Sequence, residues 1–102
     1  MHGLATALAV LLAADSSEAA ALIARVESAP KDVESFISRR ASCDHFLGEE
    51  PYDRERAAEL DRVITELRCA ALARDEEKLR RAYRENRGVL QLLDETVDMG
   101  AW

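Results

Sequence analysis

The sequence predicts an all-α fold: a small bundle of four to five short helices with no sheet. Its 102 residues match the size of a single domain. Ala, Leu, Arg and Glu are abundant in a chain that is 48% hydrophobic and 33% charged and holds only four Gly and two Pro. These abundant residues favour helix because their side chains lose little rotamer freedom in it. Apolar residues also recur at steps of three and four, the spacing of one buried helical face.

The chain divides into an N-terminal apolar segment over residues 1–21, a single helical domain over residues 22–99 and a frayed C-terminus over residues 100–102. The run LATALAVLLAA over residues 4–14 is too short for a stable membrane span, which needs about 20 apolar residues. It matches the hydrophobic region of a signal peptide, and small residues follow it at a suitable distance for cleavage. A periplasmic or secreted protein is therefore expected. No Lys or Arg precedes the run, so the alternative is a cytoplasmic protein that retains an N-terminal helix over residues 4–27.

Proline and apolar spacing indicate the next two helices. Pro30 suits the first turn of a helix over residues 30–42, whose apolar stripe is Val33, Phe36 and Ile37. Pro51 suits the first position of a third helix, in which Asp53 complements the positive end of the helix dipole. The apolar face predicted for this third helix consists of Tyr52, Leu60, Val63, Ile64 and Leu67.

Two shorter helices complete the predicted bundle. Asp75 is expected to cap the fourth helix at its start, and Gly88 is expected to cap it at its end. The side chains predicted to face inward from this helix are Leu79, Ala82 and Tyr83. The apolar residues of the last helix are Val89, Leu90, Leu93 and Val97.

The formal net charge of −6 argues against two classes of partner. Nucleic-acid binding needs a basic surface that displaces counterions from phosphate, and an anionic membrane surface attracts basic segments. We therefore expect neither nucleic acid nor a membrane surface as a partner. A protein partner with a basic surface is compatible with the charge, although the sequence does not indicate its identity.

The chemically densest stretch runs from Cys43 to Arg56 and reads CDHFLGEEPYDRER. It combines a thiol, an imidazole and several carboxylates, which are the ligand types that zinc and hard cations use. The candidate metal ligands are His45, Glu49, Glu50 and Asp53. Their spacing matches no standard metal signature. In the simpler interpretation, Glu50 and Asp53 cap a helix, and His45 packs or bonds a nearby carboxylate.

No complete set of catalytic residues is evident, so a non-enzymatic protein without a cofactor is expected. Cys43 and His45 stand two apart, which places them on different faces of a helix, and no third group orients them. The neighbouring side chains of Glu49 and Glu50 diverge, which disfavours a shared acid and base role. The aromatic residues Phe46 and Tyr52 are expected in the core.

The two cysteines, Cys43 and Cys69, leave two alternatives open. They form either a disulfide, as expected of a small exported protein, or two buried free thiols. If the third helix starts near Tyr52, Cys69 lies about 25 Å along its axis. Cys43 then reaches Cys69 only if the chain from Cys43 to Pro51 leaves the helix and runs beside the third helix.

The central stretch resembles a family of small uncharacterised bacterial helical proteins. The shared pattern is the core C-D-H-F-x-G-E-E-P-Y-D-x-E-R, followed by a second cysteine, and the resemblance covers about residues 30–93. The positions that this motif marks as structural are Asp44, Phe46, Gly48, Pro51, Tyr52 and Arg56. Members often carry a signal peptide, so the resemblance implies export and a Cys43–Cys69 bridge, and it implies no reaction.

These observations predict a small non-enzymatic protein, exported to act as an interaction or envelope protein. The Cys43–Arg56 stretch is then a structural signature and a binding surface. The alternative is a metal-binding protein that uses the acidic and histidine-containing turn over residues 44–53.

Overall fold

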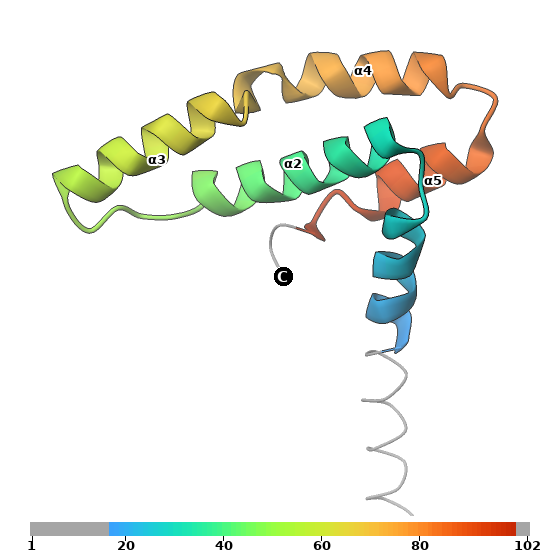
Figure 1. Cartoon of the computed structure of the whole chain (residues 1–102), viewed down its shortest axis with the longest axis horizontal. Coiled ribbons are helices and arrows are strands. Elements are labelled where there is room, and N and C mark those ends of the chain that lie inside the picture. Colours follow the sequence, from blue (N-terminus) through green and yellow to red (C-terminus); the bar gives the residue numbers. More distant parts are fainter. Residues whose placement is uncertain (1–16, 100–102) are drawn as a thin grey trace, which may run out of the picture.

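The computed structural model describes residues 17–99, and within them it is all-α with no strand, as predicted (Figure 1). Residues 17–27 form a first helix. The elements that follow are α2 (Lys31–Leu47), α3 (Arg54–Glu66), the 3-10 turn η1 (Cys69–Ala71), α4 (Leu72–Ala82) and α5 (Arg87–Glu95). The apolar run over residues 4–14 and the expected frayed end over residues 100–102 lie outside the described residues.

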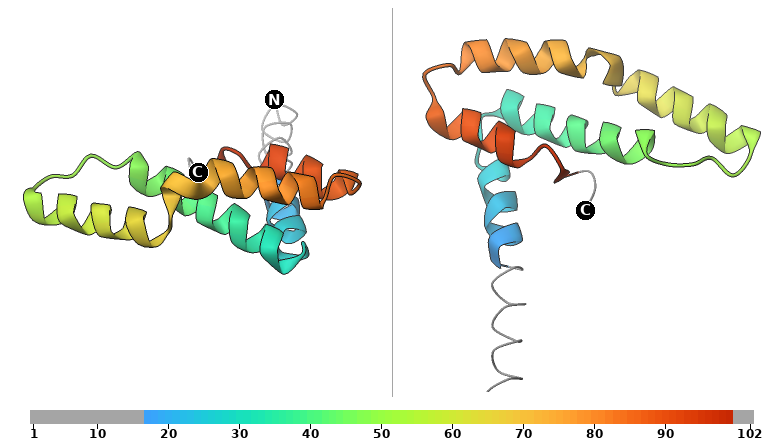
Figure 2. Two further views of the ribbon diagram at one scale, coloured as in Figure 1. Left: turned by 90° about the horizontal axis from the view of Figure 1, so that it is seen from above. Right: turned by 180° about the vertical axis from the view of Figure 1, so that it is seen from behind.

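The helices are arranged around α2. Figures 1 and 2 show α3, η1 and α4 following one another as a long, bent arm that runs antiparallel to α2. Beyond α4 the chain reverses, and α5 packs against the first half of α2. The helix over residues 17–27 stands across this layer beside α5. No helix within residues 17–99 has both the length and the apolar character that a membrane crossing requires.

The hydrophobic core lies where α2, α5 and the helix over residues 17–27 meet. The predicted stripe of α2 is confirmed, since Val33, Phe36 and Ile37 are all buried. The remaining buried members of the core are Val26, Val89, Leu92 and Leu93. Leu79 and Tyr83 pack against this cluster from α4, which confirms their predicted inward orientation. The core therefore occupies one end of the molecule, and α3 lies beyond it.

The boundaries of α2 and α3 differ from the prediction. α2 continues five residues beyond Ser42, because CDHFL contains no helix breaker, and it ends where the Gly48 N–H bonds to the carbonyl of Asp44. α3 begins at Arg54, so the placement of Pro51 at its first position is wrong. The Asp53 side chain accepts a hydrogen bond from the Arg56 N–H and so caps the helix at a later residue.

The caps predicted around α4 are also wrong. Asp75 lies inside the first turn of α4, because α4 follows directly on η1 and already begins at Leu72. Gly88 lies within α5 and does not end α4. The cap of α5 is Asn86, whose side chain accepts a hydrogen bond from the Val89 N–H.

Candidate functional site: the disulfide and the tip of the α2–α3 hairpin

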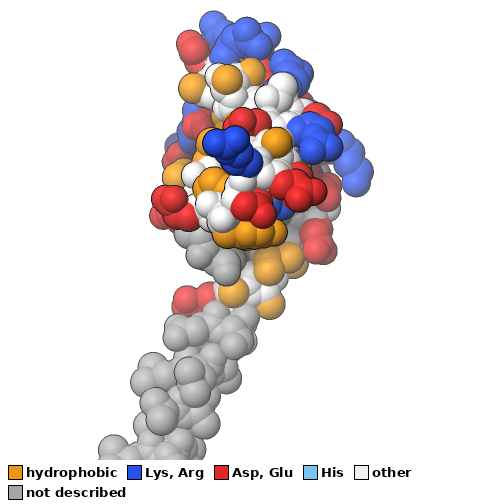
Figure 3. All heavy atoms as spheres, turned by 90° about the vertical axis from the view of Figure 1, so that its left-hand side faces the viewer, with side chains coloured by type: hydrophobic (Ala, Val, Ile, Leu, Met, Phe, Trp, Pro, Cys, Tyr) orange, Lys and Arg blue, Asp and Glu red, His pale blue; other side chains and the backbone are white. Residues whose placement is uncertain are grey.

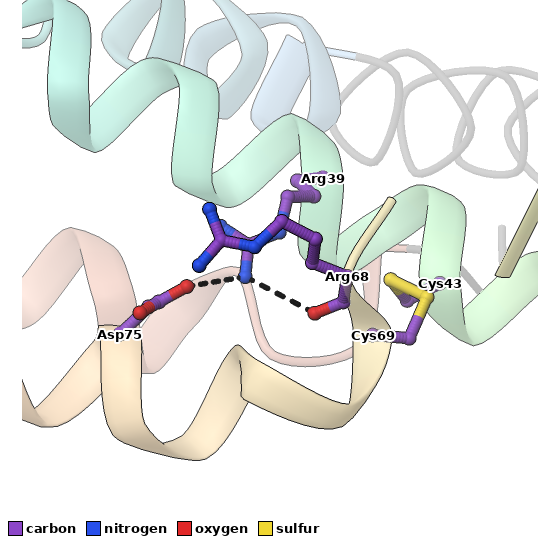
Figure 4. The surroundings of a disulfide bond; sticks show 5 residues. All are labelled: Arg39, Cys43, Arg68, Cys69 and Asp75. Carbon is purple, nitrogen blue, oxygen red and sulfur yellow. Dashed lines mark hydrogen bonds and ion pairs between the residues drawn. A yellow bond between two sulfur atoms is a disulfide. The ribbon is translucent and has the colours of Figure 1, made fainter. Parts of the chain in front are cut away.

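A disulfide joins Cys43 of α2 to Cys69 at the start of η1, with 5.7 Å between the two Cα atoms (Figure 4). Cys43 has no exposed surface, and neither cysteine is free. Of the two alternatives that the spacing left open, the structure contains the bridged one. The bond ties the middle of the long arm to α2, at a distance from the main core.

The route by which the two cysteines meet differs from the expected one. Cys43 stays helical, and the chain leaves α2 only at Gly48. The six residues 48–53 then run outward past the end of α2 (Figure 1). An extended chain of six residues spans about 20 Å. The thirteen residues of α3 return by about 20 Å, which brings Cys69 level with Cys43. The expectation that Cys43 itself must leave the helix is therefore wrong.

Arg39 reinforces the attachment of the arm beside the disulfide. Figure 4 shows its guanidinium pointing from α2 toward the junction of α3 and α4. Its Nη2 donates to a carboxylate oxygen of Asp75 at 2.6 Å and to the carbonyl of Arg68 at 3.4 Å. The hydrogen bond from Arg39 lowers the pKa of Asp75 from its ordinary value. Arg68 has a positive φ of 55°, a conformation that is unfavourable for residues other than glycine. The hydrogen bond from Arg39 to the Arg68 carbonyl supports this conformation.

Residues 47–53, which we call the tip, are held in place by Arg56. Its Nε and Nη2 donate to the two carboxylate oxygens of Glu49, and its Nη1 donates to Glu59 at 2.9 Å. Such a two-pronged arginine–carboxylate pair fixes direction as well as distance. The hydrogen bonds lower the pKa of Glu49 and raise the pKa of Arg56. Together with the Asp53 cap, this pair anchors both ends of the loop to α3.

The tip presents apolar side chains to solvent. Tyr52 is 83% exposed and Leu47 is 60% exposed, so the prediction of Tyr52 in the core is wrong. The reason is that Tyr52 belongs to the loop between α2 and α3, which extends past the end of α2 (Figure 1), and not to the buried face of α3. Phe46 is half-buried, with its ring 5.1 Å from the ring of the exposed His45. Figure 3 looks onto this end of the molecule and shows hydrophobic side chains between acidic and basic ones.

The four candidate metal ligands, His45, Glu49, Glu50 and Asp53, do not converge. Within residues 17–99 no group of three His, Cys, Asp or Glu side chains is placed to hold an ion. Glu49 instead bonds Arg56, and Asp53 caps α3, as the simpler interpretation predicted for it. The arrangement lends the metal hypothesis no support.

Sequence analysis assigned no buried role to Arg40, the most deeply buried charged residue described. It is 6% exposed and donates to Glu76 at 2.8 Å, to the carbonyl of Leu93 at 2.7 Å and to the hydroxyl of Thr96 at 2.9 Å. These bonds connect α2 to α4 and to the end of α5. The signal was present, since Arg40 continues the apolar stripe of α2 at a helical step from Ile37. An arginine in such a stripe needs buried partners.

Comparisons with known proteins add no relative to this geometry. A scan against protein-family models, a search of curated proteins and a search of solved structures each gave no match. The motif-based resemblance therefore stays a prediction, and the function has to be argued from the described residues themselves.

We predict that Arg56→Ala loosens the tip without unfolding the molecule. The pKa of Glu49 rises toward its ordinary value because its ion-pair partner is lost. In the native protein this carboxyl has a lowered pKa. The stabilisation from the pair is therefore complete above the ordinary glutamate pKa of about 4.3 and disappears as pH falls through the lowered value. A carboxyl titration of Glu49 by NMR, with amide exchange of residues 49–53, measures both effects.

Arg54→Ala is the matched control for this prediction, because Arg54 is exposed at the start of α3 and forms no ion pair with any residue from 17 to 99. It should leave the Glu49 titration and the exchange rates of the tip unchanged. Equal titration curves in the native protein and in Arg56→Ala would refute the role assigned to Arg56.

Proposed function

We propose that this chain is an exported, non-enzymatic interaction protein whose tip is the contact surface for a protein partner. The observation that carries the proposal is the exposure of Leu47 at the end of α2 and of Tyr52 on the following loop, whose two ends are anchored. Large apolar side chains usually leave water on folding, so their exposure together on a held loop is informative. Tyrosine is also enriched among the residues that dominate binding energy.

The anchoring of the loop matters for affinity. Binding orders mobile groups at a cost of about 0.5–1.5 kcal/mol for each side chain immobilised. A loop that Glu49, Arg56 and Asp53 already fix loses less freedom when a partner covers it. The tip therefore resembles a preorganised recognition element more than a passive connection between two helices.

Export is supported by two features. Disulfides persist in oxidising compartments, and a bridge joins Cys43 to Cys69. The run over residues 4–14 has the length of a signal-peptide hydrophobic region. The periplasm or the exterior of the cell is the compartment that suits both features.

One experiment in the native host tests contact and export together. A photo-crosslinking amino acid replaces Tyr52 in one strain and Thr65, an exposed residue of α3, in a control strain. We expect a discrete protein adduct from position 52 only. The intact mass of the same purified protein should show loss of about the first twenty residues. Its thiols should react only after reduction.

Absence of an adduct at position 52 would contradict the contact surface, and an equal adduct at position 65 would show that the reaction is nonspecific. A full-length chain with two reactive thiols would contradict export. These outcomes are independent, so either half of the proposal can fail alone.

A further inference from the structure

A hollow of about 500 Å³ lies between α2 and α4. Its apolar lining comes from Phe36 of α2 and from Leu79 and Ala82 of α4. Lys78 and Arg39 contribute cationic groups to its wall. Hollows of this size hold small ligands or single large side chains, and an apolar lining with a few charged groups is their usual composition. This hollow is therefore a candidate receptor for an apolar anchor with acidic neighbours.

A basic stripe runs along α4 beside the hollow, and Lys78 of this stripe lines the hollow. Arg74, Lys78 and Arg81 are exposed and follow one another at steps of four and three, which places them in one stripe along the helix. Lys78 and Arg81 form no ion pair with any residue from 17 to 99, and Arg74 reaches only Asp75 at 3.9 Å. In a chain of net charge −6, this stripe is a local reversal of sign.

The two acidic residues that line the hollow already have partners. Asp32 accepts a hydrogen bond from the Tyr83 hydroxyl at 2.7 Å, and Asp75 accepts one from Arg39 at 2.6 Å. Lys78 has no such partner among the described residues. Among the charged residues that line the hollow, Lys78 is therefore the one that no described residue pairs, and it lies beside the apolar lining.

The tip has the complementary composition. Its apolar anchors, Tyr52 and Leu47, are exposed, and Pro51 directly precedes Tyr52 in the chain. The exposed carboxylates in and around the tip are Asp44, Glu50, Asp53 and Glu55. Figures 1 and 2 show the loop between α2 and α3 at one end of the molecule and α4 toward the other. The aromatic anchor with its acidic surround lies in that loop, whereas the apolar hollow lies between α2 and α4, beside the basic stripe of α4.

We propose that the tip of one copy docks into the α2–α4 hollow of a second copy of this chain. The inference rests on the proposed function and names its partner. The tip cannot turn back into the hollow of its own copy, because the disulfide and the Arg56 bonds hold it pointing away from α4. The contact is head-to-tail, so each added copy presents a free tip and a free hollow, and the assembly grows with concentration.

Sedimentation velocity of the native protein tests this proposal. We expect the average mass to rise above that of one copy as concentration increases in about 0.02 M salt. We expect it to fall again in about 0.5 M salt, because the ions screen the attraction between exposed charges. Tyr52→Ala should weaken association by about thirtyfold, the usual loss at a binding hot spot. A single-copy mass at all concentrations and at both salt levels overturns the proposal.

Charge reversal identifies the two surfaces. Lys78→Glu in the hollow and Glu50→Lys on the tip should each abolish self-association by placing like charges together. A mixture of these two variants should associate again with the two variants alternating. The reversed tip of one variant attracts the reversed hollow of the other, and the native tip of the second attracts the native hollow of the first. The matched controls are Arg62→Glu and Glu27→Lys, exposed positions outside both surfaces, and they should associate like the native protein. A mixture that stays monomeric overturns the pairing.

These results separate the inference from the proposed function. If the native protein is monomeric while position 52 crosslinks to a different protein in the host, the second copy is the wrong occupant and the tip is still a contact surface. If position 52 crosslinks to nothing and no association occurs, both proposals fail.

Discussion

Replacing Cys43 and Cys69 together by alanine should lower the free energy of unfolding by about 3.5 kcal/mol. The bond closes a loop with a sequence separation of 26, and its loss returns the corresponding chain entropy to the unfolded state. The effect matters here because Leu60 is the one buried residue that α3 contributes. Without the bridge, α3 is held by one buried residue and by contacts at the surface.

Chemical denaturation, followed by circular dichroism, measures this loss. Reduction of the native protein serves as the control, since it removes the same bond without changing the sequence and should produce nearly the same midpoint. Amide exchange should accelerate in α3 and the tip more than in α5, whose residues Val89, Leu92 and Leu93 stay in the core. Coincident unfolding curves for the oxidised and reduced protein would contradict this account.

The parts of the fold that could be predicted from the sequence are those that repeat at helical spacing. Val33, Phe36 and Ile37 in α2 and Val89 and Leu93 in α5 lie on one face of their helices, and all are buried. Such positions are decided by local geometry and burial together. The all-α class follows from the same residues.

Helix ends were predicted less well, because several residues could serve as caps. Pro51 and Asp53 are both favourable near a helix start, and only the contact between Asp53 and the Arg56 N–H decides between them. Gly88 can end a helix but here continues one, because Asn86 caps α5 just before it. The exposure of Tyr52 follows from this choice, since a later start for α3 leaves Tyr52 in the loop.

The candidate site depends on contacts between residues that are distant in the sequence. Glu49 and Arg56 stand on opposite sides of the loop, and Cys43 meets Cys69 only because the outward loop and the returning helix have similar lengths. No local pattern encodes these distances. The hollow likewise needs α2 and α4 to lie side by side, which the spacing of apolar residues leaves open.

Replacing Arg40 should be the most damaging single substitution of a charged residue in α2. We expect Arg40→Ala to lower the free energy of unfolding by about 3–5 kcal/mol, because it removes one partner from a buried charge network. The substitution leaves the Leu93 carbonyl without the Arg40 donor and removes the partner of Glu76 on α2. It also removes the cation that lies 5.2 Å from the centre of the Phe36 ring.

The neighbouring residue Arg39 is the matched control, since it stands on the same helix and also bonds an acidic residue of α4. Its side chain is 23% exposed, compared with 8% for that of Arg40. Water can therefore solvate more of the polar groups that lose their partner when Arg39 is removed. Arg39→Ala should therefore cost about 1 kcal/mol. Arg40→Lys should fall between the two, because one ammonium cannot reproduce the planar fork that reaches Glu76, Leu93 and Thr96 together. If Arg39→Ala and Arg40→Ala prove equally destabilising, burial is not what gives Arg40 its importance.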